Sequence, residues 1–350
     1  MFGEGQKSFD KTGVVPIVLP QSRAEVGYME AALALIGEDL KNVELQFKKD
    51  LQSDVPLIRK VGEYVLSSGG KRIRPALLLL TAKLCGYRGD RHVPLASVIE
   101  FIHTATLLHD DVVDNANLRR GIASANTLWG NEASVLVGDF LFSKSFSLMV
   151  ADGDLNVLKV LSAATTIIAE GEVLQLISTS DMDVTEERYI EVVKCKTAIL
   201  LSAACQAGAI LGKATQEREE ALRDFGMALG IAFQLMDDML DYVASEKQFG
   251  KSIGHDLEEG KITLPLIHTL KQCTPTEREL IADIVEKDVL DKSDFQTVFD
   301  LVHRYSGIDY TVARARDYTA SAKSFLAVFE DSPEKYALLS LADYVVTRVK

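Results

Sequence analysis

Two short acidic motifs embedded in apolar sequence constrain this chain of 350 residues more than any other feature. Residues 108–114 read LHDDVVD and residues 235–241 read LMDDMLD, so the same DDxxD spacing occurs twice. At about 100° per residue, the outer two aspartates of each motif share one face of a helix, and the middle one lies about 80–100° away. Unpaired carboxylates beside Leu, Val and Met are costly to bury. We therefore expect both segments to be helices whose acidic faces meet cations.

The rest of the chain also reads as helices. From about residue 22 onward, helical patterns are separated by short turns at 68–70, 86–90, 121, 151–154, 180–181 and 249–260, and strand-like alternation is scarce. No break is long enough to be an interdomain linker. The pattern predicts an all-α protein with a variable segment over residues 1–25 and a single domain over 26–350. The segment 93–114 is apolar on most faces and is predicted to be a central helix.

Composition excludes several classes of function. The chain has 51 acidic and 38 basic residues and a net charge of −13, which argues against general binding to nucleic acids or to anionic membranes. The four cysteines are widely spaced without a CxxC pair, as is usual in a reducing compartment. The N-terminus lacks a signal pattern, and no uninterrupted apolar run approaches the ~20 residues of a membrane helix. We expect a cytoplasmic protein without stable membrane insertion.

The two motifs favour a metal site. Carboxylates are hard ligands, and without interleaved Cys or paired His they indicate Mg²⁺, which often bridges substrate phosphates. The alternative is that each motif is only the acidic face of a surface helix. A second alternative comes from Glu100 and His103, whose Glu-x-x-His spacing is half of a di-iron signature, but the second copy that such a bundle needs is missing. His103 instead lies within about 20° of Asp110 and Asp114 on the helical wheel, where it could contact a ligand.

Basic residues are concentrated where an anion could bind. Lys71 and Arg74 follow a double glycine at the start of a predicted helix, and Arg119 and Arg120 follow the first motif. Glycines let the backbone approach a phosphate, and Lys and Arg supply donors to its oxygens. Further candidates are two lysines in a glycine-punctuated loop that could close as a lid, and three polar residues inside apolar helices, which need partners. These are Lys251, Lys261, Lys196, Thr197 and Gln234.

The segments GGKRIRP, DDVVDNANLRRG, KT, FQLMDDMLD and GKSIGHDLEEGK occur in this order between about residues 50 and 270. In this the chain resembles the trans-polyprenyl diphosphate synthases, and among them the long-chain octaprenyl type. The resemblance implies an all-helical isoprenoid-synthase fold with a central cavity, a homodimer, and isopentenyl diphosphate and an allylic diphosphate as substrates. It implies Mg²⁺ bound by Asp110, Asp111, Asp114, Asp237, Asp238 and Asp241, an isopentenyl diphosphate site of Lys71, Arg74, His103 and Arg120, and an allylic site of Arg119, Lys196, Thr197, Gln234, Lys251 and Lys261.

The reaction that the resemblance implies is loss of diphosphate from the allylic substrate, attack by isopentenyl diphosphate and loss of a proton, which the departing diphosphate accepts. Diphosphate leaves poorly unless cations take up its charge. The resulting carbocation needs dipoles, for which the Lys196 carbonyl, the Thr197 hydroxyl and the Gln234 amide oxygen are candidates.

Product length should depend on Thr106 and Ala105, four and five residues before Asp110, because small residues there let the growing tail pass. We expect a product of about C40 for quinone side chains, and only transient membrane contact on its release. A shorter-chain geranylgeranyl-type synthase, a helical terpene cyclase and a non-catalytic partner subunit stay open as alternatives. Lys71 and Arg74 argue against the cyclase, and the complete set of aspartates argues against the inactive subunit.

Overall fold

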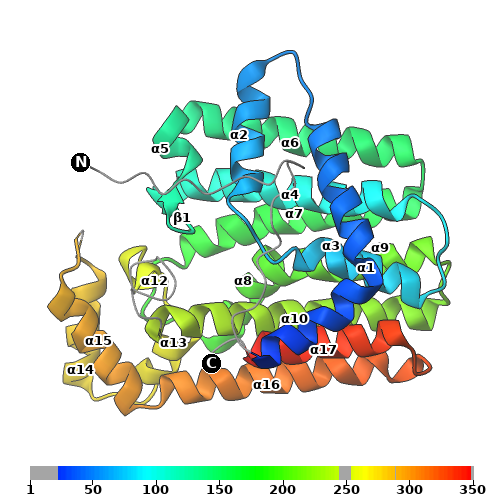
Figure 1. The fold of residues 1–350 in the computed structure, drawn as a ribbon. Coiled ribbons are helices and arrows are strands. Elements are labelled where there is room, and N and C mark those ends of the chain that lie inside the picture. The colour runs from blue at the N-terminus through cyan, green and yellow to red at the C-terminus, as the bar shows by residue number, and fades with distance from the viewer. Residues whose placement is uncertain (1–22, 244–253, 288, 348–350) are drawn as a thin grey trace.

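The structure, a computed structural model, describes residues 23–243, 254–287 and 289–347, and its almost entirely helical architecture confirms the predicted all-α class (Figure 1). The predicted variable segment at 1–25 lies largely outside the described residues. The helices are α1 (Arg23–Asp50), α2 (Pro56–Ser67), α3 (Ile73–Leu84), α4 (His92–Val113), α5 (Ala125–Trp129), α6 (Asn131–Asp152), α7 (Leu155–Ile177), α8 (Glu186–Val193), η1 (Lys194–Ala198), α9 (Ile199–Leu211), α10 (Gln216–Val243), α12 (His255–Glu258), α13 (Leu264–Leu270), α14 (Pro275–Val285), α15 (Lys292–Arg304), α16 (Gly307–Phe325), η2 (Leu326–Val328) and α17 (Pro333–Thr347).

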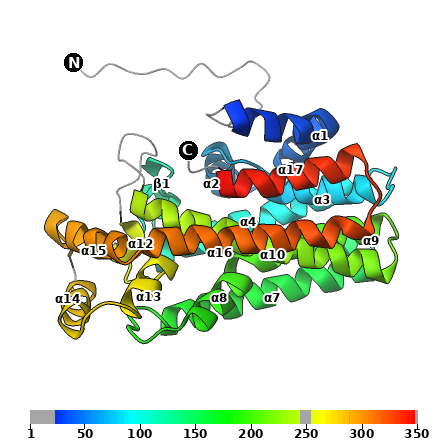
Figure 2. The ribbon, with the colours of Figure 1, turned by 90° about the horizontal axis from the view of Figure 1, so that it is seen from below.

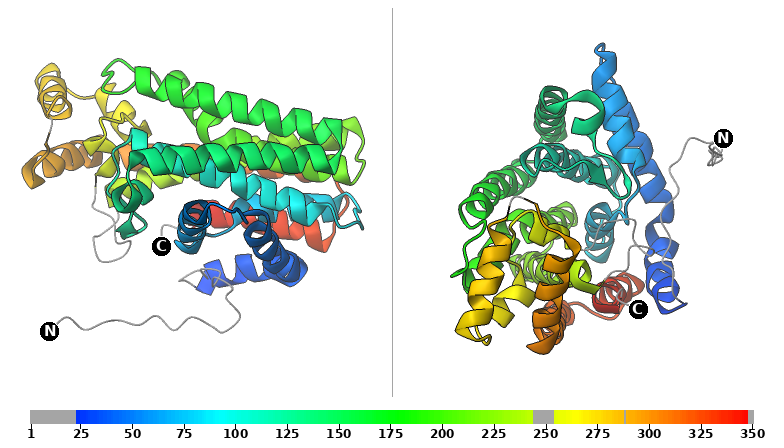
Figure 3. Two further views of the ribbon diagram at one scale, coloured as in Figure 1. Left: turned by 90° about the horizontal axis from the view of Figure 1, so that it is seen from above. Right: turned by 90° about the vertical axis from the view of Figure 1, so that its left-hand side faces the viewer.

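The long helices run along the molecule and bring both acidic motifs to one end. α10 lies beside α16, α17 packs against α1, and α4 packs against α6 (Figures 1 and 2). The short helices α12 to α15 gather at the end of the molecule where α10 finishes (Figure 3). Each motif occupies the C-terminal end of its helix, α4 or α10. The two sets of carboxylates therefore lie among the same loops and short helices.

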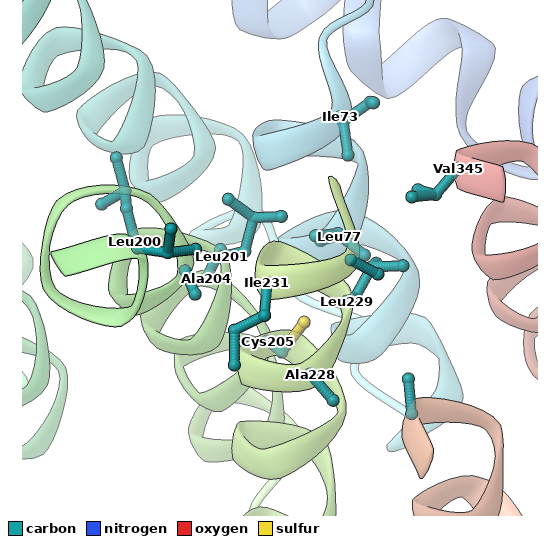
Figure 4. Close-up of a cluster of buried hydrophobic side chains, with 14 of the residues drawn as sticks. Ile73, Leu77, Leu200, Leu201, Ala204, Cys205, Ala228, Leu229, Ile231 and Val345 are labelled. Atoms are coloured by element: carbon teal, nitrogen blue, oxygen red, sulfur yellow. The ribbon is translucent and has the colours of Figure 1, made fainter. Parts of the chain in front are cut away.

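The core is apolar, and α9 lies at its centre. Leu201 and Cys205 of α9 are buried in one apolar cluster with Leu77 of α3 and Leu229 of α10 (Figure 4). α9 approaches α3 closely because residue 208 is glycine: a Cβ at Gly208 would lie 2.1 Å from the Thr81 hydroxyl. Burial of so many aliphatic side chains, at about 25 cal/mol per Å², holds the helices in fixed positions around the motifs.

Two local features differ from the sequence-based expectation. The helix predicted over 93–114 ends at Val113, so Asp114 is its C-terminal cap and not an interior helical residue. The break predicted at Gly121 is a two-residue hairpin between β1 (Leu118–Arg119) and β2 (Ile122–Ala123). Arg120 and Gly121 both have positive φ, at 52° and 77°, as a type I′ turn requires. Arg119 is the last residue of β1 and Arg120 is the first residue of the turn, so the two side chains leave the backbone in different directions.

Three helical segments are long and apolar enough to cross a membrane by length and composition: α6, α7 and the continuous segment from Glu186 to Leu211. Small residues and a few charged residues interrupt the apolar sequence of each of these segments. Most of the third segment is buried inside the protein, whereas α6 and α7 are largely uncovered. Leu136 on α6 is 67% exposed, and Leu155 and Ile177 on α7 are 77% and 69% exposed.

Candidate active site

The first motif is tied to the hairpin that follows it. Asp111 is buried, and its carboxylate accepts hydrogen bonds from Arg119 Nε at 2.7 and 2.9 Å. Arg119 Nη2 is 2.6 Å from Oδ1 of the same aspartate, so the pair is bidentate. The Asn126 side chain in α5 donates to the Asp111 carbonyl at 3.0 Å, which fixes the end of α4. Arg119, predicted as a substrate ligand, therefore neutralises the first motif in this structure.

A π turn presents Lys196 and Thr197. In η1 the Ile199 amide donates to the Lys194 carbonyl five residues earlier, and such insertions in helices are frequent at functional sites. Two glycines let neighbouring helices approach this turn. A Cβ at Gly171 of α7 would lie 2.9 Å from the Lys196 backbone nitrogen, and one at Gly230 of α10 would lie 2.5 Å from Ala198 Cα. Lys196 Nζ is 2.6 Å from Glu172 and 3.9 Å from Asp110.

A chain of hydrogen bonds connects Thr197 to the second motif. The Thr197 hydroxyl donates to Gln234 Oε1 at 2.9 Å, and Gln234 Nε2 donates to Asp238 Oδ1 at 2.7 Å. The Tyr189 hydroxyl donates to Asp238 Oδ2. Both oxygens of this buried carboxylate thus have donors. The predicted grouping of Thr197 and Gln234 is present, and a hydrogen bond joins it to the second motif.

The segment after the second motif bridges both. The amides of His255 and Asp256, at the start of α12, donate to the Asp241 carboxylate at 3.2 and 3.0 Å. Lys261 Nζ is 3.0 Å from Asp114 Oδ2 and 2.6 Å from Glu259. One short segment therefore binds the last aspartate of each motif. Lys251, the other lysine predicted here, lies outside the described residues.

Arg74, His103 and Arg120 form a second cationic cluster. Arg74 Nη1 lies 3.1 Å from His103 Nε2. Arginine can only donate, so this histidine nitrogen accepts and the imidazole proton is on Nδ1. Burial and the nearby arginines lower the pKa of His103, which keeps it neutral, and burial lowers the pKa of Arg74 and of Arg120. Arg74 Nε is buried without an acceptor, and the Arg120 guanidinium would lie 3.2 Å from a Cβ at Gly70. An anion would satisfy these groups.

Glu100 does not belong to a metal site. Its carboxylate is 2.8 Å from Arg72 Nη1, and Glu44 lies 3.4 Å from Arg72 Nε. Arg72 has a left-handed backbone, with φ of 51°, immediately before α3. The Glu-x-x-His reading as half of a di-iron site is therefore wrong, because the two side chains contact different arginines. Arg72 is therefore a structural residue of the basic patch.

The electrostatics of the two motifs suit a divalent cation. Burial, opposed by Lys196 and reinforced by Asp114, raises the pKa of Asp110. Burial also raises the pKa of Asp238 to about 6, although its two hydrogen bonds oppose the shift. Among the described residues, no three acidic, His or Cys side chains converge closely enough to hold a metal ion. The donor chemistry still fits Mg²⁺, because the aspartates supply only hard oxygen ligands.

The residues predicted to control chain length lie on different sides of α4. Ala105 is fully buried in a small apolar cluster with Phe101, Leu108 and, from α6, Val137 and Leu141. Thr106 is half-buried and its hydroxyl donates to the His103 carbonyl at 2.8 Å. Ala105 therefore packs against side chains of the neighbouring helix α6. A tail that passes Ala105 would have to run between α4 and α6.

Lys71 extends towards α17, where its Nζ is 4.8 Å from the centroid of the Tyr344 ring. A groove of about 480 Å³ lies between α7, α9 and α10 and is lined in part by Val160, Ala203 and Met227. None of the predicted site residues lines this groove.

Sequence reasoning missed Glu172 and Tyr189. Burial and the charge of Asp110 raise the pKa of Glu172 to about 7, and Lys196 opposes this shift. Burial, with the charge of Asp238, raises the pKa of Tyr189. The signal available for Glu172 was the Glu-Gly-Glu sequence at 170–172 within a mainly apolar helix. Tyr189 gave none, since it reads as an ordinary core aromatic.

Comparison with known proteins gives a consistent result. The family model described as polyprenyl synthetase matches residues 55–302. Octaprenyl diphosphate synthase of Escherichia coli is 45% identical over 320 residues, covering 91% of this chain and 99% of that protein. The crystal structure of a decaprenyl diphosphate synthase from Rhodobacter capsulatus aligns with a TM-score of 0.87 and 42% identity, covering 92% of this chain and 99% of that one. A polyprenyl synthase from Caulobacter crescentus, complexed with calcium and isoprenyl diphosphate, aligns with a TM-score of 0.88 and 41% identity over 91% and 97% of the two chains.

Proposed function

The chain belongs to the polyprenyl synthetase family and is a trans-prenyl diphosphate synthase, and on this premise we propose that it adds isopentenyl diphosphate repeatedly to an allylic diphosphate in a Mg²⁺-dependent reaction. We propose a product of about C40 for quinone side chains. The similarity to an octaprenyl synthase supports this length, whereas the similarity to a decaprenyl synthase leaves room for a longer product.

The observation that carries the proposal is that the cationic side chains of the site form two separate groups. Lys196, Lys261 and Arg119 lie against carboxylates of the first motif. Arg74 and Arg120 form a different cluster, in which a buried guanidinium nitrogen lacks an acceptor. Burial lowers the pKa of both arginines, so an anion bound between their guanidinium groups would stabilise the charged forms. Two diphosphates, one at each cluster, match the two substrates of a condensing enzyme.

The residues of the chain divide the work of the reaction. We assign the isopentenyl diphosphate to Arg74, His103 and Arg120, with Lys71 as a further predicted ligand. We assign the allylic diphosphate to Lys196, Lys261 and Arg119, with Lys251 as a further predicted ligand. The six aspartates Asp110, Asp111, Asp114, Asp237, Asp238 and Asp241 would hold Mg²⁺, which when bound neutralises charge on the leaving diphosphate. The calcium and isoprenyl diphosphate in the Caulobacter protein support a divalent cation with a prenyl diphosphate in this fold.

Thr197 and Gln234 face the carbon skeleton in this assignment. The Thr197 hydroxyl uses its proton for Gln234, so its oxygen lone pairs stay available to a carbocation. Gln234 in turn is oriented by its bond to Asp238. Fixed dipoles of this kind stabilise developing positive charge without reorganising. The neutral His103 imidazole accepts from Arg74 and so keeps the guanidinium directed at the diphosphate.

We further propose a homodimer that forms through α6 and α7. The support is the exposed apolar surface of these helices, which includes Leu136, Leu155 and Ile177. Light scattering of the purified protein tests the mass. A cytoplasmic location with only transient membrane contact on product release stays a proposal, and cell fractionation tests it.

Product analysis tests the proposed function. Purified protein is incubated with Mg²⁺, farnesyl diphosphate and labelled isopentenyl diphosphate, and the dephosphorylated products are sized by chromatography. The expected result is a series of products that ends at about C40. A series that stops at C20 would instead assign a geranylgeranyl-type synthase. Absence of any condensation, with every allylic primer and in a folded protein, would contradict catalysis and favour a non-catalytic subunit.

A further inference from the structure

Glu172 has no role in the mechanism above, yet it lies at the allylic diphosphate site. Its Oε2 accepts a hydrogen bond from Lys196 Nζ at 2.6 Å, and the same Nζ is 3.9 Å from Asp110 Oδ2. One ammonium group therefore stands between two carboxylates. It is hydrogen-bonded to the carboxylate outside the motif and only near the one inside it.

Helix packing determines this arrangement. A Cβ at Gly171 would lie 2.7 Å from Cys195 Cβ and 2.9 Å from the Lys196 nitrogen, so only glycine lets α7 approach the π turn so closely. The next residue, Glu172, is thereby delivered to the Lys196 side chain. Its own side chain is 27% exposed, and its Oε1 is buried without a hydrogen-bond partner. A partly buried pair of this kind interacts more strongly than a surface ion pair.

The two possible partners of Lys196 have opposite effects on the site. If Glu172 lacked its charge, Asp110 would be the nearest carboxylate to the ammonium. A direct Lys196–Asp110 hydrogen bond would occupy an oxygen that a divalent cation needs. It would also turn the ammonium away from the phosphate oxygens.

We propose that Glu172 is a positioning residue, which holds the Lys196 ammonium off Asp110 so that Asp110 can bind a divalent cation and Lys196 can bind the allylic diphosphate. This inference rests on the proposed function, because it concerns the same two substrates. It assigns Glu172 no contact with either of them. Its effect must therefore pass through Lys196.

The test is Glu172→Gln at pH 8, where the Glu172 carboxyl is ionised because burial raises its pKa only to about 7. The substitution keeps the shape of the side chain and removes its charge. The Mg²⁺ concentration for half-maximal activity and the KM for the allylic diphosphate should each rise about tenfold, which corresponds to one charge-assisted hydrogen bond. The KM for isopentenyl diphosphate should change less than twofold. Calorimetry with Mg²⁺ and an unreactive farnesyl thiodiphosphate should show the same tenfold loss without any turnover. Glu172→Asp, which retains the charge, should recover most of the Mg²⁺ affinity.

Two further variants make the interpretation specific. Glu170→Gln changes an exposed glutamate on the same helix and should leave all three constants unchanged. In a Lys196→Ala background, Glu172→Gln should add less than twofold to the loss of allylic binding, because the residue through which it acts is absent.

The outcomes separate the inference from the function on which it rests. A wild-type protein that condenses no substrate would overturn the proposed function. An active wild-type protein whose Glu172→Gln variant keeps the wild-type Mg²⁺ dependence and allylic affinity would overturn the role of Glu172 alone. Full additivity of Glu172→Gln and Lys196→Ala in calorimetry would do the same, since it would mean that Glu172 acts without Lys196.

Discussion

Replacement of Asp238 by Asn should stabilise the metal-free protein and abolish its activity. Burial raises the pKa of this carboxyl to about 6 from 3.8, a shift of about 2 units, and each unit is worth about 1.4 kcal/mol. Ionised Asp238 therefore costs the folded protein about 3 kcal/mol at pH 7.5. Asn avoids this cost, but its side chain cannot accept hydrogen bonds from both Tyr189 and Gln234. The lost hydrogen bond destabilises the variant by about 1 kcal/mol. The free energy of unfolding should rise by about 1–2 kcal/mol, which for a chain of this length corresponds to about 1–3 °C in Tm.

The assay is thermal unfolding of both proteins in chelator at pH 7.5 and again with Mg²⁺, together with turnover of the allylic substrate. Mg²⁺ should raise the Tm of the wild type more than that of Asp238→Asn, and turnover of the variant should fall by at least a hundredfold. Asp283→Asn, at an exposed position of α14, is the matched control and should change neither quantity. A variant that is less stable than the wild type in chelator, or that retains turnover, would refute the view that this carboxylate is held ready for a cation.

Three other predictions follow from the same site. Arg74→Ala should raise the KM for isopentenyl diphosphate about tenfold or more and change the KM for the allylic diphosphate much less, as measured by steady-state kinetics. Arg59→Ala, at an exposed position, is the control, and equal losses for both substrates would contradict separate pockets. Ala105→Tyr should shorten the product if the tail passes between α4 and α6, at a cost of about 1–3 kcal/mol in stability from overpacking; a folded, active variant with a full-length product would exclude this path. The pKa of Asp238 is higher in the folded than in the unfolded state, so this group makes the metal-free protein more stable as pH falls from about 6 towards 3.8. Mg²⁺ should therefore raise the Tm less at pH 5.5 than at pH 7.5, and an equal rise at both pH values would contradict Mg²⁺ binding by this carboxylate.

Much of the fold and of the site could be predicted because the relevant signals are local. Helical periodicity and glycine turns predicted the breaks at 68–70, 86–90 and 151–154, and each of them separates two helices. The DDxxD spacing likewise follows from helix geometry, and it placed both motifs on helices, in which Asp111 and Asp238 are buried. The short strands at Leu118–Ala123 were missed because a hairpin of two residues per strand has no periodicity to detect.

The pairing of charges could not be predicted, because it depends on tertiary contacts. Arg119, Lys196 and Lys261 were all plausible partners for the first motif, and only the packing of the hairpin, the π turn and the segment after α12 decides which aspartate each contacts. The role of Glu172 depends on a close helix approach at Gly171, which a helical wheel does not reveal. Helix packing also decides that Ala105 lies on the side of α4 that faces α6, which the sequence alone does not reveal.

The central claim is that both acidic motifs bind divalent cations together with an allylic diphosphate. The most direct measurement is anomalous diffraction from crystals grown with Mn²⁺ and farnesyl thiodiphosphate. We predict anomalous peaks beside Asp110 and Asp114 and a further peak beside Asp238, with the diphosphate between them and within reach of Lys196. Diphosphate bound at this position without a cation, or cations on only one of the two motifs at saturating Mn²⁺, would contradict the account.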